Sequence, residues 1–318
     1  MPQPNKLAIL SAFAALYLIW GSTYLAILFA IETIPPLLMA GARFLLAGLM
    51  LYAIARWKGA PKESFANWRT ALIIGGCLLL GGNGGVTLAE QYVPSGLASV
   101  IVATVPIYMA VLAWSSGIAP RPTPIVWVGL AGGLAGVAIL LAPNLHFSPN
   151  ETGHPAAGMF ILLFSSFVWS AGSIYSRKAK SASPPLLLAG QQMICGGALL
   201  TLAGLLTGEH DRFDAGRISA LSIGAFAYLV IIGALVGYTA YIFLLRHCAP
   251  AKVATYAYVN PIVAVILGAI FAGETLSARS FLAAGLIIGS VALVITVQRT
   301  KTELVPPEVA CLEAANET

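Results

Sequence analysis

Three long stretches of the sequence carry no charged side chain: Leu7 to Ile31, Leu97 to Pro120 and Pro155 to Ser176. A helix of about 20 apolar residues is long enough to cross a hydrocarbon core of roughly 30 Å. Of the 318 residues, 58% are hydrophobic and only 9% are charged, whereas soluble domains carry about 25% charged residues. These features predict an integral membrane protein and exclude a soluble globular domain.

Charged residues, proline pairs and polar clusters divide the chain into ten segments that each fit a membrane-spanning helix. We expect an all-α integral membrane protein with ten transmembrane helices, at residues 7–30, 35–55, 70–91, 95–115, 124–142, 156–176, 184–207, 218–245, 251–272 and 279–297. The first segment is interpreted as a retained span and not as a cleaved signal peptide, because it is long and has Trp20 and Tyr24 in its middle. Residues 299–318 are polar and contain a proline pair, so we expect a disordered cytoplasmic tail.

Lysine and arginine residues lie mainly in alternate loops. If the N-terminus is cytoplasmic, 13 of them fall in cytoplasmic segments and 3 in external loops. Cytoplasmic loops of membrane proteins retain Lys and Arg. We therefore expect both termini and the 56–69 loop in the cytoplasm, the 146–154 loop outside, and the protein in a cell inner (plasma) membrane.

The segment "PPLLMAG" at Pro35 recurs as "PPLLLAG" at Pro184, 149 residues later. Two further pairs have the same separation, and beyond residue 210 the separation becomes 156: Trp20 with Trp169, Gly48 with Gly197, then Pro94 with Pro250 and Ala98 with Ala254. The chain therefore reads as two repeats of five helices, residues 1–142 and 156–298. Because five is odd, the second repeat must be inverted in the membrane, an architecture that secondary transporters use for alternating access. A duplication retained only for stability is the alternative.

Several motifs resemble a known family: "WGSTYLAI" at Trp20, "RFLLAGL" at Arg43, "PSGLASVIVATVPIYMAVLA" at Pro94 and "VATYAYVNPIVAVILGAIFAGETLS" at Val253. Together with the layout of five plus five helices, they resemble the EamA-type transporters of the drug/metabolite transporter superfamily, near the YedA-like branch. The resemblance implies a ten-helix basket with a central cavity lined by helices 1, 3, 4, 6, 8 and 9. It also implies export or exchange of small metabolites such as amino acids. Glu274 departs from the repeat, since the first half has no acidic equivalent.

A charged residue at membrane depth is costly unless it is paired or faces water, so it indicates a functional site. Arg43 lies about a third of the way into the second helix, where Glu90 at the end of the third could reach it. A structural ion pair between the two helices and a binding site for a substrate anion are equally compatible with this pattern.

Prolines stand among polar residues in two helices related by the repeat, the fourth and the ninth. Pro106 is near Thr104 and Tyr108, and Pro261 follows Asn260. A proline frees a backbone carbonyl inside a helix, so such a cluster can form a polar ligand site. Plain tyrosine packing with local backbone repair is the alternative.

Helices 1 and 6 add aromatic and hydroxyl groups that can stack on or hydrogen-bond a ligand. The predicted substrate-binding residues are Trp20, Thr23, Tyr24, Arg43, Asn83, Thr104, Tyr108, Trp169, Tyr175, Tyr256 and Asn260, with Glu90 and Glu274 as candidates for an ion pair or for ion coupling.

The sequence offers no constellation for catalysis and no His/Cys cluster for a metal, so we expect neither an enzyme nor a cofactor. The net charge of +5 follows from the basic cytoplasmic loops and does not indicate nucleic-acid binding. Small-residue spacing in helices 5 and 10, as at Gly129 and Gly285, favours close helix packing and a homo-oligomer through such faces. The expected partners are membrane lipid and a small-molecule substrate. A secondary transporter explains these features best; the alternative is a membrane protein with a structural or assembly role.

Overall fold

The computed structural model describes residues 5–92, 98, 101–141, 155–179, 184–271 and 278–303. Within these residues the chain forms ten helical rods, and six of them are long and apolar enough to cross a membrane. In chain order the rods are α1 (Lys6–Ile31), α2 (Pro36–Trp57), α3 with η1 and α4 (Phe65–Gly75, Gly76–Gly84 and Gly85–Ala89), α6 (Val105–Ser115), α7 (Pro124–Leu141), α8 (Pro155–Lys178), α9 (Pro185–Leu206), α10 with η5 and α11 (Ala220–Tyr228, Leu229–Tyr238 and Thr239–His247), α12 with α13 (Pro250–Val253 and Tyr256–Phe271) and α14 (Ala278–Glu303). The predicted all-α fold with ten helices is confirmed.

Helix ends differ from the prediction in three places. The third rod begins at Phe65, because the Ser64 side chain accepts a hydrogen bond from the backbone N–H of Asn67 and so caps the helix earlier. Pro106 lies in the first turn of α6 and not in the middle of a helix. The first backbone N–H groups of a helix have no partner within it, so the missing N–H of Pro106 breaks no hydrogen bond. α14 continues to Glu303, so the first residues of the expected tail are helical. The predicted external loop at 146–154 lies outside the described residues.

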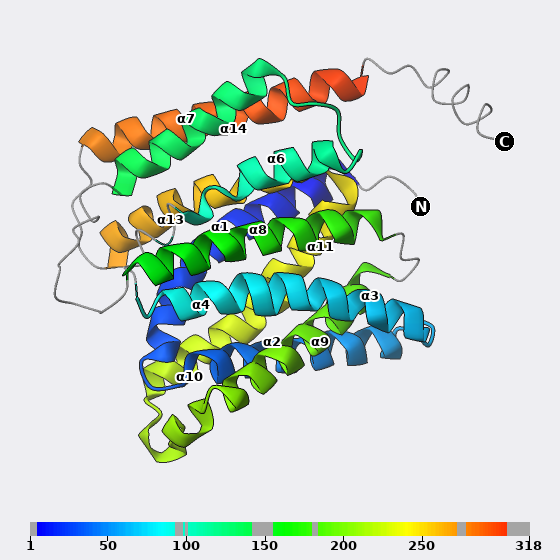
Figure 1. Ribbon diagram of the computed structural model, residues 1–318, viewed down its shortest axis with the longest axis vertical. Coiled ribbons are helices and arrows are strands. Elements are labelled where there is room, and N and C mark those ends of the chain that lie inside the picture. Colours follow the sequence, from blue (N-terminus) through cyan, green and yellow to red (C-terminus); the bar gives the residue numbers. More distant parts are fainter. Residues whose placement is uncertain are drawn as a thin grey trace.

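The helix directions show that the second half is inverted. The equivalent helices α1 and α8 run in opposite directions, as do α2 and α9 (Figure 1). Equivalent helices also make equivalent contacts. α1 packs on α13 and η5 of the second half, while α8 packs on α6 and η1 of the first half. α2 packs on α9 and α7 packs on α14, so each of these pairs lies on the symmetry axis. We call the side where α1 begins, at Lys6, the basic side and the opposite side the distal side.

Glycines bring the axial helices into backbone contact. A Cβ atom built on Gly48 would lie 2.7 Å from the backbone N of Ile194, and one built on Gly197 would lie 2.6 Å from the backbone N of Leu45. Neither position of the α2–α9 contact therefore accepts a larger side chain. In the other axial pair Gly129 packs against Val294, whereas Gly285 of α14 has no atom within 4 Å of a built Cβ. The close packing predicted for α7 and α14 thus uses the glycines of α7 only.

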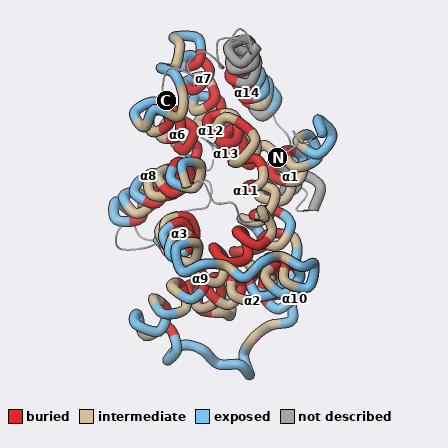
Figure 2. The backbone as a smooth tube through the Cα atoms, turned by 90° about the vertical axis from the view of Figure 1, so that its right-hand side faces the viewer, coloured by how far each residue is buried: buried red, intermediate tan, exposed pale blue. Residues whose placement is uncertain are grey.

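Large apolar side chains cover the outside of the bundle. Buried residues face the inside of the bundle and exposed residues its perimeter (Figure 2). Phe160 is 70% exposed, Leu18 62% and Ile288 59%. An apolar perimeter around an interior with buried serines and glutamines is the arrangement expected in lipid.

Candidate functional site

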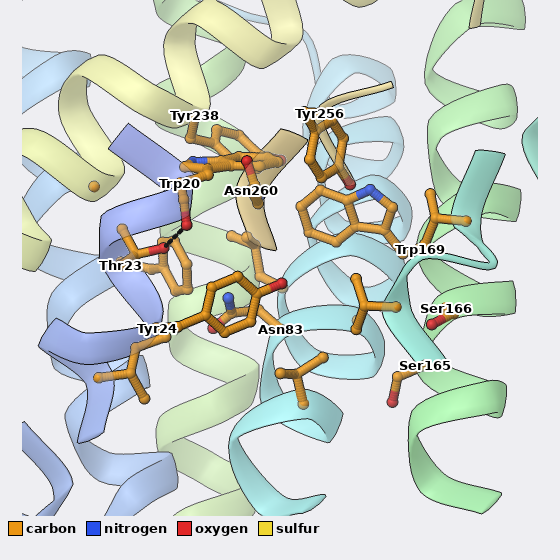
Figure 3. Close-up of a pocket in the computed structure, with 18 of the residues that line it drawn as sticks. Trp20, Thr23, Tyr24, Asn83, Ser165, Ser166, Trp169, Tyr238, Tyr256 and Asn260 are labelled. Carbon is orange, nitrogen blue, oxygen red and sulfur yellow. Dashed lines mark hydrogen bonds between the residues drawn. The ribbon is translucent and has the colours of Figure 1, made fainter. Parts of the chain in front are cut away.

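A central cavity of about 100 Å³ lies between α1, α2, η1, α8, η5 and α13. Figure 3 shows its wall, with side chains from both repeats pointing toward one another. Eight of the predicted binding residues line it: Trp20, Thr23, Tyr24, Arg43, Asn83, Trp169, Tyr256 and Asn260. The volume holds a few water molecules, so this conformation accommodates only a small ligand.

Two π-helical segments form part of the wall, one from each repeat. η1 contributes Gly82 and Asn83, and η5 contributes Gly233 and Tyr238. A π-helix leaves backbone groups less regularly paired than an α-helix and often marks a functional site. Both repeats place this irregularity in their third helix, at the cavity wall.

Four rings close the basic side of the cavity, and we call them the aromatic cluster: Trp20, Trp169, Tyr241 and Tyr256. The ring centroids of Trp20 lie 4.9 Å from Tyr256, 5.1 Å from Tyr241 and 5.5 Å from Trp169. The Tyr241 hydroxyl lies 2.6 Å from Ser173 Oγ and joins the cluster to α8. These ring contacts lie across the basic side of the cavity and join α1, α8, α11 and α13.

Glycines make room for both tryptophans. A Cβ on Gly82 would lie 2.6 Å from Trp169 Cε3, and a Cβ on Gly237 would lie 2.7 Å from Trp20 Nε1. Each tryptophan therefore rests on the π-helical segment of the other repeat. The Thr23 hydroxyl donates a hydrogen bond of 2.8 Å to the Trp20 carbonyl on the same wall (Figure 3).

Arg43 contacts Asn83 and not Glu90. Its Nη2 donates a 2.9 Å hydrogen bond to Asn83 Oδ1, and its guanidinium lies 4.2 Å from the centroid of the Phe44 ring. Among the described residues, ion pairs within 4.0 Å join His210 with Asp211 and Arg217 with Asp214 only. No carboxylate of the described residues lies within 4.0 Å of Arg43, although the opposite charges of Arg43 and Glu90 attract each other over a longer distance.

Four buried polar atoms of cavity residues have no hydrogen-bond partner in the described part of the chain: Arg43 Nε, Ser166 Oγ, Trp169 Nε1 and Asn260 Oδ1. An unpaired buried donor or acceptor destabilises a fold by about 1–3 kcal/mol. Water or a ligand in the cavity would satisfy these atoms. Arg43 Nε and Trp169 Nε1 are donors, Ser166 Oγ can donate or accept, and Asn260 Oδ1 is an acceptor.

Three predicted residues lie away from the cavity. The Thr104 hydroxyl donates to the carbonyl of Ile101, the Tyr108 ring packs on the half-exposed Phe167, and Tyr175 is 38% exposed. Glu274 lies outside the described residues. Glu90 ends the third rod with a buried, unpartnered Oε1, outside the cavity wall.

The prediction missed Ser165, Ser166 and Tyr238, which also line the cavity. The two serines lie one helical turn before Trp169, a spacing that could have placed them on the same face. Tyr238 directly follows Gly237 and has no aromatic equivalent in the first repeat. In the parts of the chain that the structure describes, no group of His, Cys, Asp and Glu side chains could hold a metal ion.

Comparison with known proteins identifies the family. The sequence profile of the EamA-like transporter family matches residues 6–142 and again 156–296. The chain belongs to this family. The inner membrane transporter YedA of Escherichia coli is 40% identical over 290 residues, which cover 91% of this chain and 90% of YedA. The transporter YvbV of Bacillus subtilis is 27% identical, with 92% of each chain covered.

A more distant relative carries a functional name. The "probable amino-acid metabolite efflux pump" of Salmonella typhimurium is 24% identical over 85% of this chain and 89% of its own length. A crystal structure with 21% identity has a TM-score of 0.75 and covers 93% of this chain and 100% of its own, which supports the fold. This EamA-family protein is thus a multi-pass membrane transporter and not an enzyme, and like YedA it is an inner-membrane protein.

Proposed function

We propose that this transporter exports or exchanges small zwitterionic metabolites of the amino-acid class by alternating access. The observation that carries the proposal is the chemistry of the cavity wall, which holds one cation, Arg43, the unpartnered acceptor Asn260 Oδ1 and several aromatic rings. A carboxylate pairs with the guanidinium. An ammonium group pairs with the amide oxygen and the ring faces of Trp20 and Tyr24.

The size and charge of the cavity support a small ligand with no net charge. Typical pockets for drug-sized ligands have volumes of about 300–1,000 Å³, several times the volume found here. A multiply charged phosphate would need more than one cation. The name of the Salmonella relative points to the same class of substrate.

The two repeats, residues 1–142 and 156–298, are the moving units of this proposal. The basic side is cytoplasmic, with both termini there, because Lys and Arg are retained on that side. The aromatic cluster closes the cytoplasmic side of the cavity in the present conformation. Rocking of one repeat against the other would open that side and close the distal one.

Thermal unfolding of the purified protein with a panel of ligands tests the proposal. A zwitterionic amino acid at about 100 times its dissociation constant stabilises the folded state by about 2.7 kcal/mol. Its methyl ester, which lacks the carboxylate, should give no shift. Counterflow in proteoliposomes should then show exchange of the same amino acid.

Two variants distinguish binding from packing. Asn260→Ala should weaken binding about 10-fold or more, since a hydrogen bond to a charged group contributes about 1.5–3 kcal/mol. Tyr175→Phe, which changes a hydroxyl outside the cavity, is the matched control. Equal stabilisation by the ester and the acid, or unchanged binding by Asn260→Ala, would show that the zwitterion assignment is wrong.

A further inference from the structure

A second group of buried polar side chains lies on the basic side of the aromatic cluster. Gln191 and Gln192, about two turns into α9, are both 0% exposed. Both amide atoms of Gln191, the Nε2 of Gln192 and the Oγ1 of Thr239 have no hydrogen-bond partner among the described residues. The Tyr238 hydroxyl donates a 3.0 Å hydrogen bond to Gln192 Oε1. Buried amides without partners destabilise the closed conformation.

The inverted repeat relates this group to the cavity. Gln192 follows Arg43 by 149 residues, the separation found in the first two helices of the repeat. In the third helix the separation is 155, since Trp169 packs on Gly82 and Trp20 packs on Gly237, so Tyr238 is the equivalent of Asn83. Arg43 and Asn83 contact each other in the cavity wall on the distal side. Gln192 and Tyr238, joined by their hydrogen bond, hold the same positions in the second repeat and therefore the equivalent place on the basic side; Thr239 directly follows Tyr238.

Backbone contact between α3 and α9 seals this group. A Cβ on Gly75 would collide with the carbonyl oxygen of Gln192 and lie 2.9 Å from the backbone N of Gly196. A Cβ on Gly196 would lie 2.7 Å from the carbonyl oxygen of Gly75. The equivalent positions on the distal side are Ala47 and Val230, which carry side chains. The basic side can therefore close backbone to backbone, whereas the distal side cannot close in this way.

We infer that Gln191, Gln192 and Thr239 line the open passage on the basic side in the alternate conformation, and that the Gly75–Gly196 contact is its closed gate. This inference rests on alternating access as proposed above. It gives the two sides of the pathway different chemistry. A carboxylate meets the guanidinium of Arg43 on the distal side and neutral amide donors on the basic side, so it is held less strongly where α3 and α9 separate.

Cysteine accessibility tests the inference without any substrate. A single cysteine at Gln191→Cys, in a background that lacks the four native cysteines, is exposed to a membrane-impermeant sulfonated maleimide from one side of the membrane at a time. In the parent protein the labelling is slow, because the position is sealed. Adding Gly196→Leu, which holds the gate open, should raise labelling from the basic side at least about 10-fold, the effect of a tenfold shift in population.

Two controls complete the labelling experiment. Gly285→Leu, at a position with open space around it, should leave the rate unchanged. Asn83→Cys should label from the distal side, and more slowly once Gly196→Leu is added. Labelling of Gln191→Cys from the distal side, or no increase in a Gly196→Leu protein that purifies as a single folded species, would overturn the inference. A wrong substrate class would leave both labelling results unchanged.

A second variant does not depend on opening the gate. Gln191→Leu removes an unpartnered amide from the sealed conformation, so the melting temperature should rise by about 2 °C or more. Labelling of Thr239→Cys from the basic side should become slower in the same variant. A lower melting temperature would mean that Gln191 has a packing role in the closed state, and this too would overturn the inference.

Discussion

Glu209 caps a helix that lies far from it in the sequence. It belongs to η3 (Glu209–Arg212), between α9 and α10, and is 3% exposed. Its carboxylate accepts hydrogen bonds of 3.1 Å and 2.9 Å from the backbone N–H groups of Leu37 and Leu38, in the first turn of α2. The N-cap residue of α2 is Pro35, whose side chain makes no capping bond. Glu209 therefore takes the place of an N-cap and ties the second repeat to the first.

Replacing Glu209 by alanine should lower the free energy of unfolding by about 2–4 kcal/mol. A hydrogen bond to a charged group contributes about 1.5–3 kcal/mol, and a carboxylate at a helix N-terminus adds about 0.3–1 kcal/mol. Water entering the loop recovers part of the loss. Glu209→Gln keeps one acceptor oxygen and should show about half of the effect.

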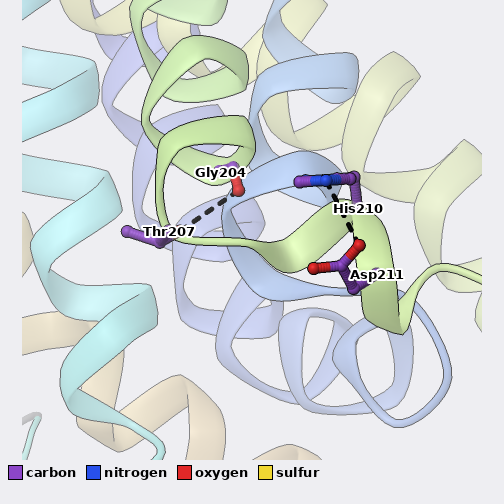
Figure 4. Close-up of polar contacts among 4 residues, drawn as sticks. All are labelled: Gly204, Thr207, His210 and Asp211. Carbon is purple, nitrogen blue, oxygen red and sulfur yellow. Dashed lines mark hydrogen bonds and ion pairs between the residues drawn. The ribbon is translucent and has the colours of Figure 1, made fainter.

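Asp211 offers a matched control on the same short helix. It forms a 3.2 Å ion pair with His210 at an exposed position, beside the turn in which Thr207 bonds the carbonyl of Gly204 (Figure 4). Exposed ion pairs contribute about 0–1 kcal/mol, so Asp211→Asn should have little effect. Denaturant unfolding in detergent micelles measures all three variants. Equal losses for Glu209→Ala and Asp211→Asn would refute the capping role.

Three further predictions follow from the packing. Gly197→Leu should prevent recovery of folded protein, because the α2 backbone occupies the space that the new side chain needs. Gly285→Leu should purify normally, and size-exclusion chromatography compares the two variants. Tyr256→Ala should weaken ligand binding about 10-fold or more, whereas Tyr108→Ala, outside the cavity, should not weaken it. Isothermal titration calorimetry measures both affinities, and equal effects would contradict the cavity assignment. Lys62→Cys should react with an impermeant thiol reagent from the cytoplasmic side only, and reaction from outside would reverse the proposed topology.

The sequence predicts the helices well because lipid restricts what a chain can do. Without water in the hydrocarbon core, backbone groups must pair within each segment, so apolar runs become helices. The repeat around Pro35 and Pro184 then implies inversion by counting alone. Helix ends depend on single capping residues, which are a weaker signal than an apolar run. The third rod begins at Phe65, for example, because the Ser64 side chain caps it.

The cavity was predictable where two signals agreed. Trp20 is aromatic in mid-span and matches Trp169 in the repeat, and both tryptophans line the cavity. Tyr108 and Tyr175 have the right chemistry on the wrong face of their helices, because the break before α6 and the course of α8 set directions that composition does not reveal. Arg43 bonds Asn83, which lies in the π-helical segment η1, and not the expected Glu90; the sequence carries no clear signal for such a segment.

Distances between spin labels at both ends of α1 and α8 test the central claim, that the repeats rock about the cavity. The two helices contact each other through Trp20 and Trp169. One label pair joins Glu32 and Ala156 on the distal side, and the other joins Leu7 and Lys178 on the basic side; all four positions are exposed. When a transported amino acid is added to protein in nanodiscs, double electron–electron resonance should show one distance shortening while the other lengthens. Two distances that change in the same direction, or that stay fixed during measured exchange, would contradict the account.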